Sequence, residues 1–120
     1  MASNTLKRNK EIIHRHNNGE TFVKLAEEYG IAAGNMSLIY YGFEYLVDRP
    51  CYDLVADMDF SDQIASKLVN ALCRYEGVKG IDVDAEYIKA MDRKELLIQR
   101  GVGKAVMDAF DKLQEAVRNG

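Results

Sequence analysis

A single proline, Pro50, divides this sequence of 120 residues into two stretches that both have helical periodicity. Proline disfavours helical backbone at the residue before it and cannot continue a helix, so a break is expected at 49–58. On either side, apolar residues recur with a period of 3.6, and no segment has the period of two that marks a strand. The pattern predicts an all-α protein with one unit at 1–48, a protease-sensitive linker at 49–58 and a second unit at 59–120.

Residues 1–48 are expected to form three helices, the first over residues 6–17. Thr21 can cap the second helix, and Gly30 can end it in the left-handed conformation. The small Ala26 allows two helices to cross closely, and the glycine four residues later suits the tight turn between them. The run at 25–31 resembles the helix-turn-helix of bacterial and phage transcription regulators, and the resemblance covers roughly residues 6–45.

This resemblance implies that the third helix and its neighbours contact DNA. Its outward positions hold no Arg or Lys, the commonest partners of guanine, but they offer amide and hydroxyl groups for base edges and a tyrosine for a phosphate. Basic side chains lie in the first helix, where they are expected to hold phosphates, which position a protein without reading sequence. A plain three-helix packing motif, or one that binds protein, is the alternative. The candidate residues of this unit are Asn35, Ser37, Tyr41, Lys7, Arg8 and Lys10.

The second unit ends in a glycine-rich connection between two expected helices. Ser61 is expected to cap its first helix, and Asp92 with Glu95 has the spacing of a capping box. The connection reads Arg-Gly-Val-Gly-Lys at 100–104. Such a hairpin, with a positive φ expected at Gly103, can turn backbone N–H groups toward an anion where the last helix begins. Lys104 is unfavourable in a first helical turn unless a phosphate binds there, and a solvated lysine is the alternative.

In the order of these parts, residues 60–113 resemble the C-terminal domain of the bacterial RNA polymerase alpha subunit, a compact helical module that ends in a helix-hairpin-helix. The resemblance implies contact with the DNA minor groove and its phosphates. Lysine stands where the family places an arginine in the first helix, and a lysine offers a hydrated point charge in place of a planar fork. The residues that the resemblance and the hairpin assign to DNA are Lys67, Asn70, Arg100, Gly101, Gly103 and Lys104.

Other classes of function are disfavoured by composition and spacing. A net charge of −3 excludes a uniformly basic nucleic-acid binder, although not a local basic patch. The chain shows no apolar stretch long enough for a membrane and no signal-peptide pattern, so a cytoplasmic protein is expected. Two cysteines form neither a CxxC pair nor a disulfide framework, and His14 and His16 point to different sides of a helix. We therefore expect no metal, no cofactor and no enzymatic activity.

Together these patterns predict a transcription-associated regulator that binds duplex DNA through phosphate contacts from both units. Its expected partners are duplex DNA and, through the second resemblance, RNA polymerase or another transcription factor. The alternative is a protein-interaction adaptor, of phage or mobile-element type, that engages the transcription machinery without sequence-specific DNA binding. The net negative charge and the lack of Arg and Lys on the third helix favour the adaptor, whereas the grouped positive charges favour DNA.

Overall fold

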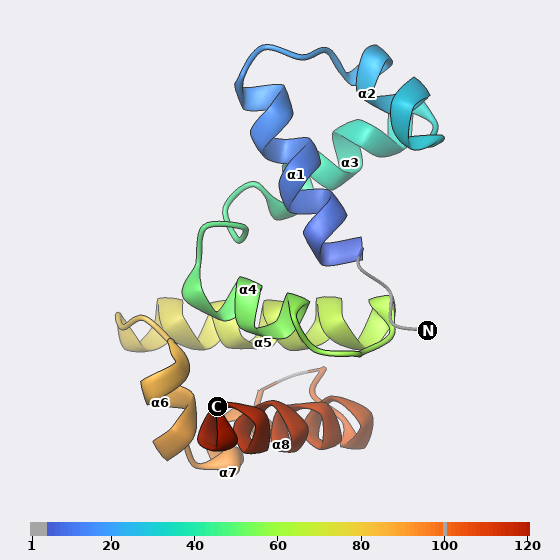
Figure 1. The fold of residues 1–120 in the computed structure, drawn as a ribbon. Helices are drawn as coiled ribbons and strands as arrows, with labels where there is room; N and C mark the ends of the chain where they lie inside the picture. Colours follow the sequence, from blue (N-terminus) through green and yellow to red (C-terminus); the bar gives the residue numbers. More distant parts are fainter. Residues whose placement is uncertain (1–4, 100) are drawn as a thin grey trace.

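The computed structural model describes residues 5–99 and 101–120 and confirms the all-α fold within them (Figure 1). These residues hold eight helices and no strand. Helices α1 to α3 lie at one end of the molecule, and α5 lies between them and α8. The helices are α1 Thr5–Asn17, α2 Phe22–Tyr29, α3 Ala33–Phe43, α4 Pro50–Ala56, α5 Asp62–Lys79, α6 Ala85–Ala90, α7 Arg93–Leu97 and α8 Lys104–Asn119.

Several helix ends form where local sequence signals predict them. The Thr21 side chain accepts a hydrogen bond from the Lys24 N–H, and Ser61 caps α5 in the same way. Gly30 ends α2 with a φ of 68°, a conformation that a residue without a Cβ adopts readily. The expected capping box at α7 is only half present: Asp92 caps the helix, but Glu95 accepts a hydrogen bond from the Tyr75 hydroxyl instead of reaching back.

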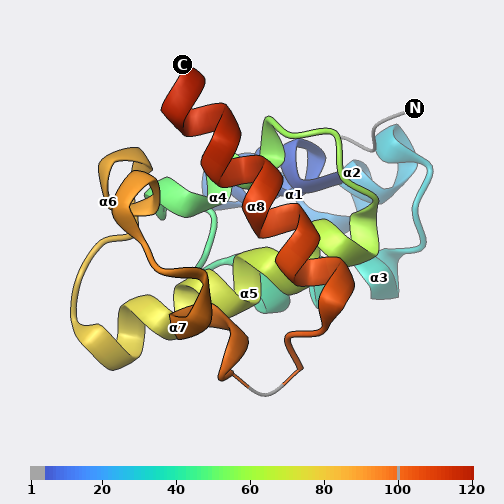
Figure 2. The ribbon, with the colours of Figure 1, turned by 90° about the horizontal axis from the view of Figure 1, so that it is seen from below.

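The buried hydrophobic side chains form two cores. The smaller core holds α1, α2 and α3 together, and Ala26 lies where α2 meets its neighbours. The larger core is built on α5, which packs against α4 and is crossed by α8 (Figure 2). Helix α1 contributes to both, because it also packs against α4 and α5. The buried residues of the smaller core are Ile12, Leu25, Ala26 and Met36.

The segment expected as a linker, 49–58, instead contains a helix that is part of the larger core. Pro50 stands at the first position of α4, where its fixed φ and missing N–H suit a helix start. Cys51, Tyr52, Val55 and Ala56 of this helix are buried. This segment is therefore not an exposed connection between independent units.

Chymotrypsin should accordingly cut after Tyr45 well before it cuts after Tyr52. Tyr45 is 76% exposed in the turn after α3, whereas Tyr52 is fully buried, and proteases need exposed and locally unfolded backbone. Mass spectrometry of early fragments under native conditions measures the order. First cleavage after Tyr52 would contradict the packing of α4 and restore the linker.

Candidate nucleic-acid interface

Two residues of α5 that were expected to contact DNA lie next to the glycine hairpin. Lys67, Asn70 and Arg74 of α5 surround a hollow of about 260 Å³ whose other side is formed by Gly101 and Val102. Lys67 and Asn70 are three residues apart and therefore share one face of the helix. The fold thus places a lysine and an amide from one helix next to the hairpin backbone.

The hairpin's backbone differs from the expected one. The positive φ lies at Gly101, at 86°, and not at Gly103, so the expectation for Gly103 is wrong. Gly103 has a φ of −100° and a ψ of −171° because it is the extended N-cap residue of α8. Its position adjoins the hollow in sequence, but Gly103 and Lys104 do not line it. Arg100, the remaining hairpin candidate, lies outside the described residues.

The start of α8 differs in its capping from the starts of α5, α6 and α7. Unlike α5, α6 and α7, this helix begins with no side-chain cap among the described residues. The first N–H groups of a helix have no partner within it and carry a partial positive charge. Lys104 is exposed and makes no ion pair in the part of the chain that the structure describes. The missing side-chain cap and the exposed Lys104 both favour an anion at the N-terminal end of α8.

The basic candidates in α1 have a different environment, because acidic residues of α4 and the loop after it pair with two of them. Lys7 lies 3.1 Å from an Asp57 carboxylate oxygen. Lys10 donates to both carboxylate oxygens of Asp53 at 2.9 Å. Arg8 donates to the side-chain oxygen of the neighbouring Asn9. The charges of Lys7 and Lys10 are paired with the protein's own aspartates, so this face is less suited to phosphates than the sequence predicted.

The outer face of α3 carries exposed apolar and aromatic side chains beside its polar ones. Asn35 and Tyr41 are exposed, but the Ser37 hydroxyl donates to the Gly34 carbonyl oxygen within its own helix. Leu38 and Tyr45, which the sequence analysis did not select, are 72% and 76% exposed. The helical pattern places Leu38 on the outward side, away from the buried Met36, whereas Tyr45 lies in the turn after α3, which the sequence did not predict.

A charge cluster joins α1, the loop that follows it and α2. The Arg15 guanidinium donates to both carboxylate oxygens of Glu20 and of Glu28, and also to the Tyr29 hydroxyl. Two-point pairing between guanidinium and carboxylate is among the stronger polar contacts in proteins. The hydrogen bond from Arg15 lowers the pKa of Glu20 from 4.5 to about 2. Arg15 therefore fixes the loop between α1 and α2 and is not available to a phosphate.

This cluster predicts an acid-sensitive contribution to stability. The lowered pKa of Glu20 stabilises the fold above about pH 4.5, and this contribution is lost as the pH falls toward 2. In Arg15→Gln, the melting temperature should be lower at pH 6 and should fall less between pH 5 and pH 2 than in the wild type. The matched control is Arg118→Gln, because within the described residues the Arg118 guanidinium donates to the Lys89 carbonyl oxygen and pairs with no carboxylate. Identical pH profiles for the wild type and Arg15→Gln would contradict this role.

Comparison of the chain with protein families, with curated proteins and with solved structures finds no match. The two family resemblances therefore remain predictions from sequence. The proposed function below rests on the charges and contacts of the described surfaces. No helix in the described part of the chain is long and apolar enough to cross a membrane.

Proposed function

We propose that this protein binds duplex DNA through the surface formed by α5 and the hairpin before α8, mainly by contacts to phosphates. The observation that carries the proposal is the hollow at which Lys67 and Asn70 meet the backbone of Gly101. A glycine hairpin allows close approach of the backbone to a phosphate, and a lysine beside it supplies the opposite charge. Arg74 adds a second cationic side chain at the same hollow.

The ion pairing of the lysines favours this surface, and not that of α1, as the one that binds phosphates. Lys67 and Lys104 have no carboxylate partner within the described residues, whereas Lys7 and Lys10 are paired with aspartates. A phosphate that approached α1 would have to compete with those carboxylates. At α5 and the start of α8, a phosphate meets Lys67 and Lys104, which no carboxylate of the described residues pairs with, and release of counterions from the DNA drives binding.

A second candidate function, a protein-interaction adaptor, is favoured by a different surface. Leu38, Tyr41 and Tyr45 are each about two thirds or more exposed, at spacings of three and four residues. Apolar and aromatic side chains at such spacings are typical of helices that dock into a groove of another protein. They are poorly suited to phosphates, and neither α3 nor the turn at 44–48 that holds Tyr45 contains a lysine or an arginine.

Titration of the protein with random duplex DNA, at several salt concentrations, tests the proposed function. Lys67→Ala and Lys104→Ala should each weaken binding similarly on every sequence and should lower the salt slope by about one. The control is Lys112→Ala on α8, because Lys112 lies at another hollow that also holds Asp59 and Asp108. Lys7→Ala should have the smaller effect expected of a lysine already paired with an aspartate.

Equal losses from Lys67→Ala, Lys104→Ala and Lys112→Ala would mean diffuse attraction and would contradict the proposed surface. Absence of binding by the intact protein at low salt would reject DNA as the ligand and would favour the adaptor. In that case purified RNA polymerase is the first partner to test, with Leu38→Glu expected to abolish any complex and Lys67→Ala expected to leave it intact.

A further inference from the structure

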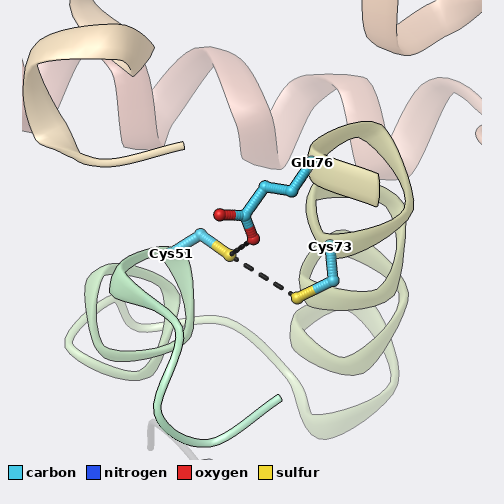
Figure 3. A group of neighbouring side chains, drawn as sticks. All are labelled: Cys51, Cys73 and Glu76. Atoms are coloured by element: carbon cyan, nitrogen blue, oxygen red, sulfur yellow. Dashed lines mark hydrogen bonds between the residues drawn. The ribbon is translucent and has the colours of Figure 1, made fainter. Parts of the chain in front are cut away.

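The junction of α4 and α5 brings two thiols and one carboxylate together (Figure 3). Cys51 comes from the first turn of α4, and Cys73 and Glu76 lie three residues apart on one face of α5. Their ligand atoms all lie within 4.8 Å of one another. Cys51 and Glu76 are buried, and Cys73 is partly buried. This group is separate from the DNA surface proposed above.

Glu76 is an unusual residue to bury at this position. Its side chain is 2% exposed, and one carboxylate oxygen accepts a hydrogen bond from the Val83 N–H at 2.9 Å. The other oxygen accepts from the Cys51 thiol, at 3.4 Å, and a thiol is a weak donor. No lysine, arginine or histidine of the described residues forms an ion pair with it. A carboxylate in such surroundings is costly to bury unless a cation joins it.

The spacing of the three ligand atoms suits a zinc ion. Tetrahedral zinc, with bonds of about 2.3 Å to sulfur and 2.0 Å to oxygen, requires about 3.8 Å between two sulfurs and about 3.5 Å between sulfur and oxygen. The Sγ atoms of Cys51 and Cys73 are 3.6 Å apart, and Cys51 Sγ is 3.4 Å from a Glu76 oxygen. The third pair, Cys73 Sγ and a Glu76 oxygen, lies within 4.8 Å, so this pair closes slightly around the ion. We propose that Cys51, Cys73 and Glu76 bind one Zn²⁺ between α4 and α5.

Binding requires little rearrangement of these groups. Each thiol gives its proton to solvent, each sulfur donates an electron pair to Zn²⁺, and the ion takes the place of the proton that now lies between Cys51 and Glu76. The Val83 N–H continues to orient the carboxylate through its second oxygen. Two thiolates, a carboxylate and Zn²⁺ sum to a charge of −1.

An adjoining hollow gives this site a route to solvent. Glu76 lines a hollow of about 360 Å³ together with Arg49 and Asp82. The guanidinium of Arg49 opposes the remaining negative charge of the occupied site. Water from the hollow can supply a fourth ligand, which three protein ligands leave open.

The experiment uses the full chain, reduced and freed of metal, and titrates Zn²⁺ against a chromogenic chelator. We expect one Zn²⁺ per chain and, with Co²⁺ as a spectroscopic substitute, a sulfur-to-metal charge-transfer band. Cys73→Ser should weaken Zn²⁺ binding by more than the roughly 100-fold that loss of an outer partner can cause. Glu76→Gln should weaken it by at least about tenfold, the lower end of that range. Circular dichroism checks that each variant folds.

Two controls separate this site from surface binding. His14→Ala removes an exposed imidazole beside Asp48, and Glu115→Gln removes an exposed carboxylate of α8; both should leave Zn²⁺ affinity unchanged. Should Cys73→Ser not fold, alkylation of the wild type decides: Zn²⁺ should protect both thiols, and Mg²⁺ should not. Unprotected thiols, unchanged affinity in Cys73→Ser, loss of affinity in His14→Ala, or a Cys51–Cys73 disulfide in place of metal binding would each overturn the proposal.

Discussion

Tyr52→Ala is expected to lower the free energy of unfolding by about 3–5 kcal/mol, the range for truncating a large buried aromatic side chain. Tyr52 is fully buried on α4, and its ring contacts that of Phe43 edge-on at 6.4 Å between centroids. Its hydroxyl donates to the Leu6 carbonyl oxygen of α1 at 2.5 Å. Removal of the side chain leaves a cavity where the two halves of the chain meet.

Urea unfolding followed by circular dichroism measures this loss. Tyr52→Phe keeps the ring and removes only the hydrogen bond, so it should cost about 1 kcal/mol. Tyr45→Ala, at an exposed tyrosine seven residues earlier, should change stability by less than about 0.5 kcal/mol. Equal losses from Tyr52→Ala and Tyr45→Ala would contradict the burial of α4.

Ile12→Ala and Ile13→Ala are each expected to cost about 2–5 kcal/mol, but in different parts of the molecule. The two side chains are adjacent in α1 and almost completely buried, yet Ile12 belongs to the smaller core and Ile13 to the larger one. Successive residues of a helix point about 100° apart, so one helix can serve two cores.

Amide hydrogen exchange distinguishes the two effects. Ile12→Ala should speed exchange first in α2 and α3, and Ile13→Ala should speed it first in α4. His14→Ala, which removes only an exposed pair with Asp48, should cost less than about 1 kcal/mol. A negligible loss from Ile13→Ala would mean that α1 is not held by the larger core.

Features set by neighbours in sequence could be predicted. The caps at Thr21 and Ser61, and the end of α2 at Gly30, depend on residues within one turn. Helix α4 was missed because proline marks both the end of one helix and the first turn of another. The apolar Tyr52 and Val55 after Pro50 were the available signal that this segment is buried.

Features that depend on distant residues could not be predicted. Nothing in the sequence around Lys7 and Lys10 indicates that aspartates 50 and 43 residues later pair with them. Cys51 and Cys73 are 22 residues apart, and only the packing of α4 on α5 brings them together. In the hairpin, the glycine pair indicated one left-handed residue, but the position of α8's first turn decided which glycine it is.

The packing of α1 into both cores also determines how the two ends of the molecule can engage one large partner. Modules on a flexible tether search for their sites independently, and they tolerate a range of separations and rotations between those sites as long as the tether can span them. Here α3 and the hairpin before α8 are joined through buried contacts, so they present two contact points at a set distance and rotation. A partner that touches both must match that geometry.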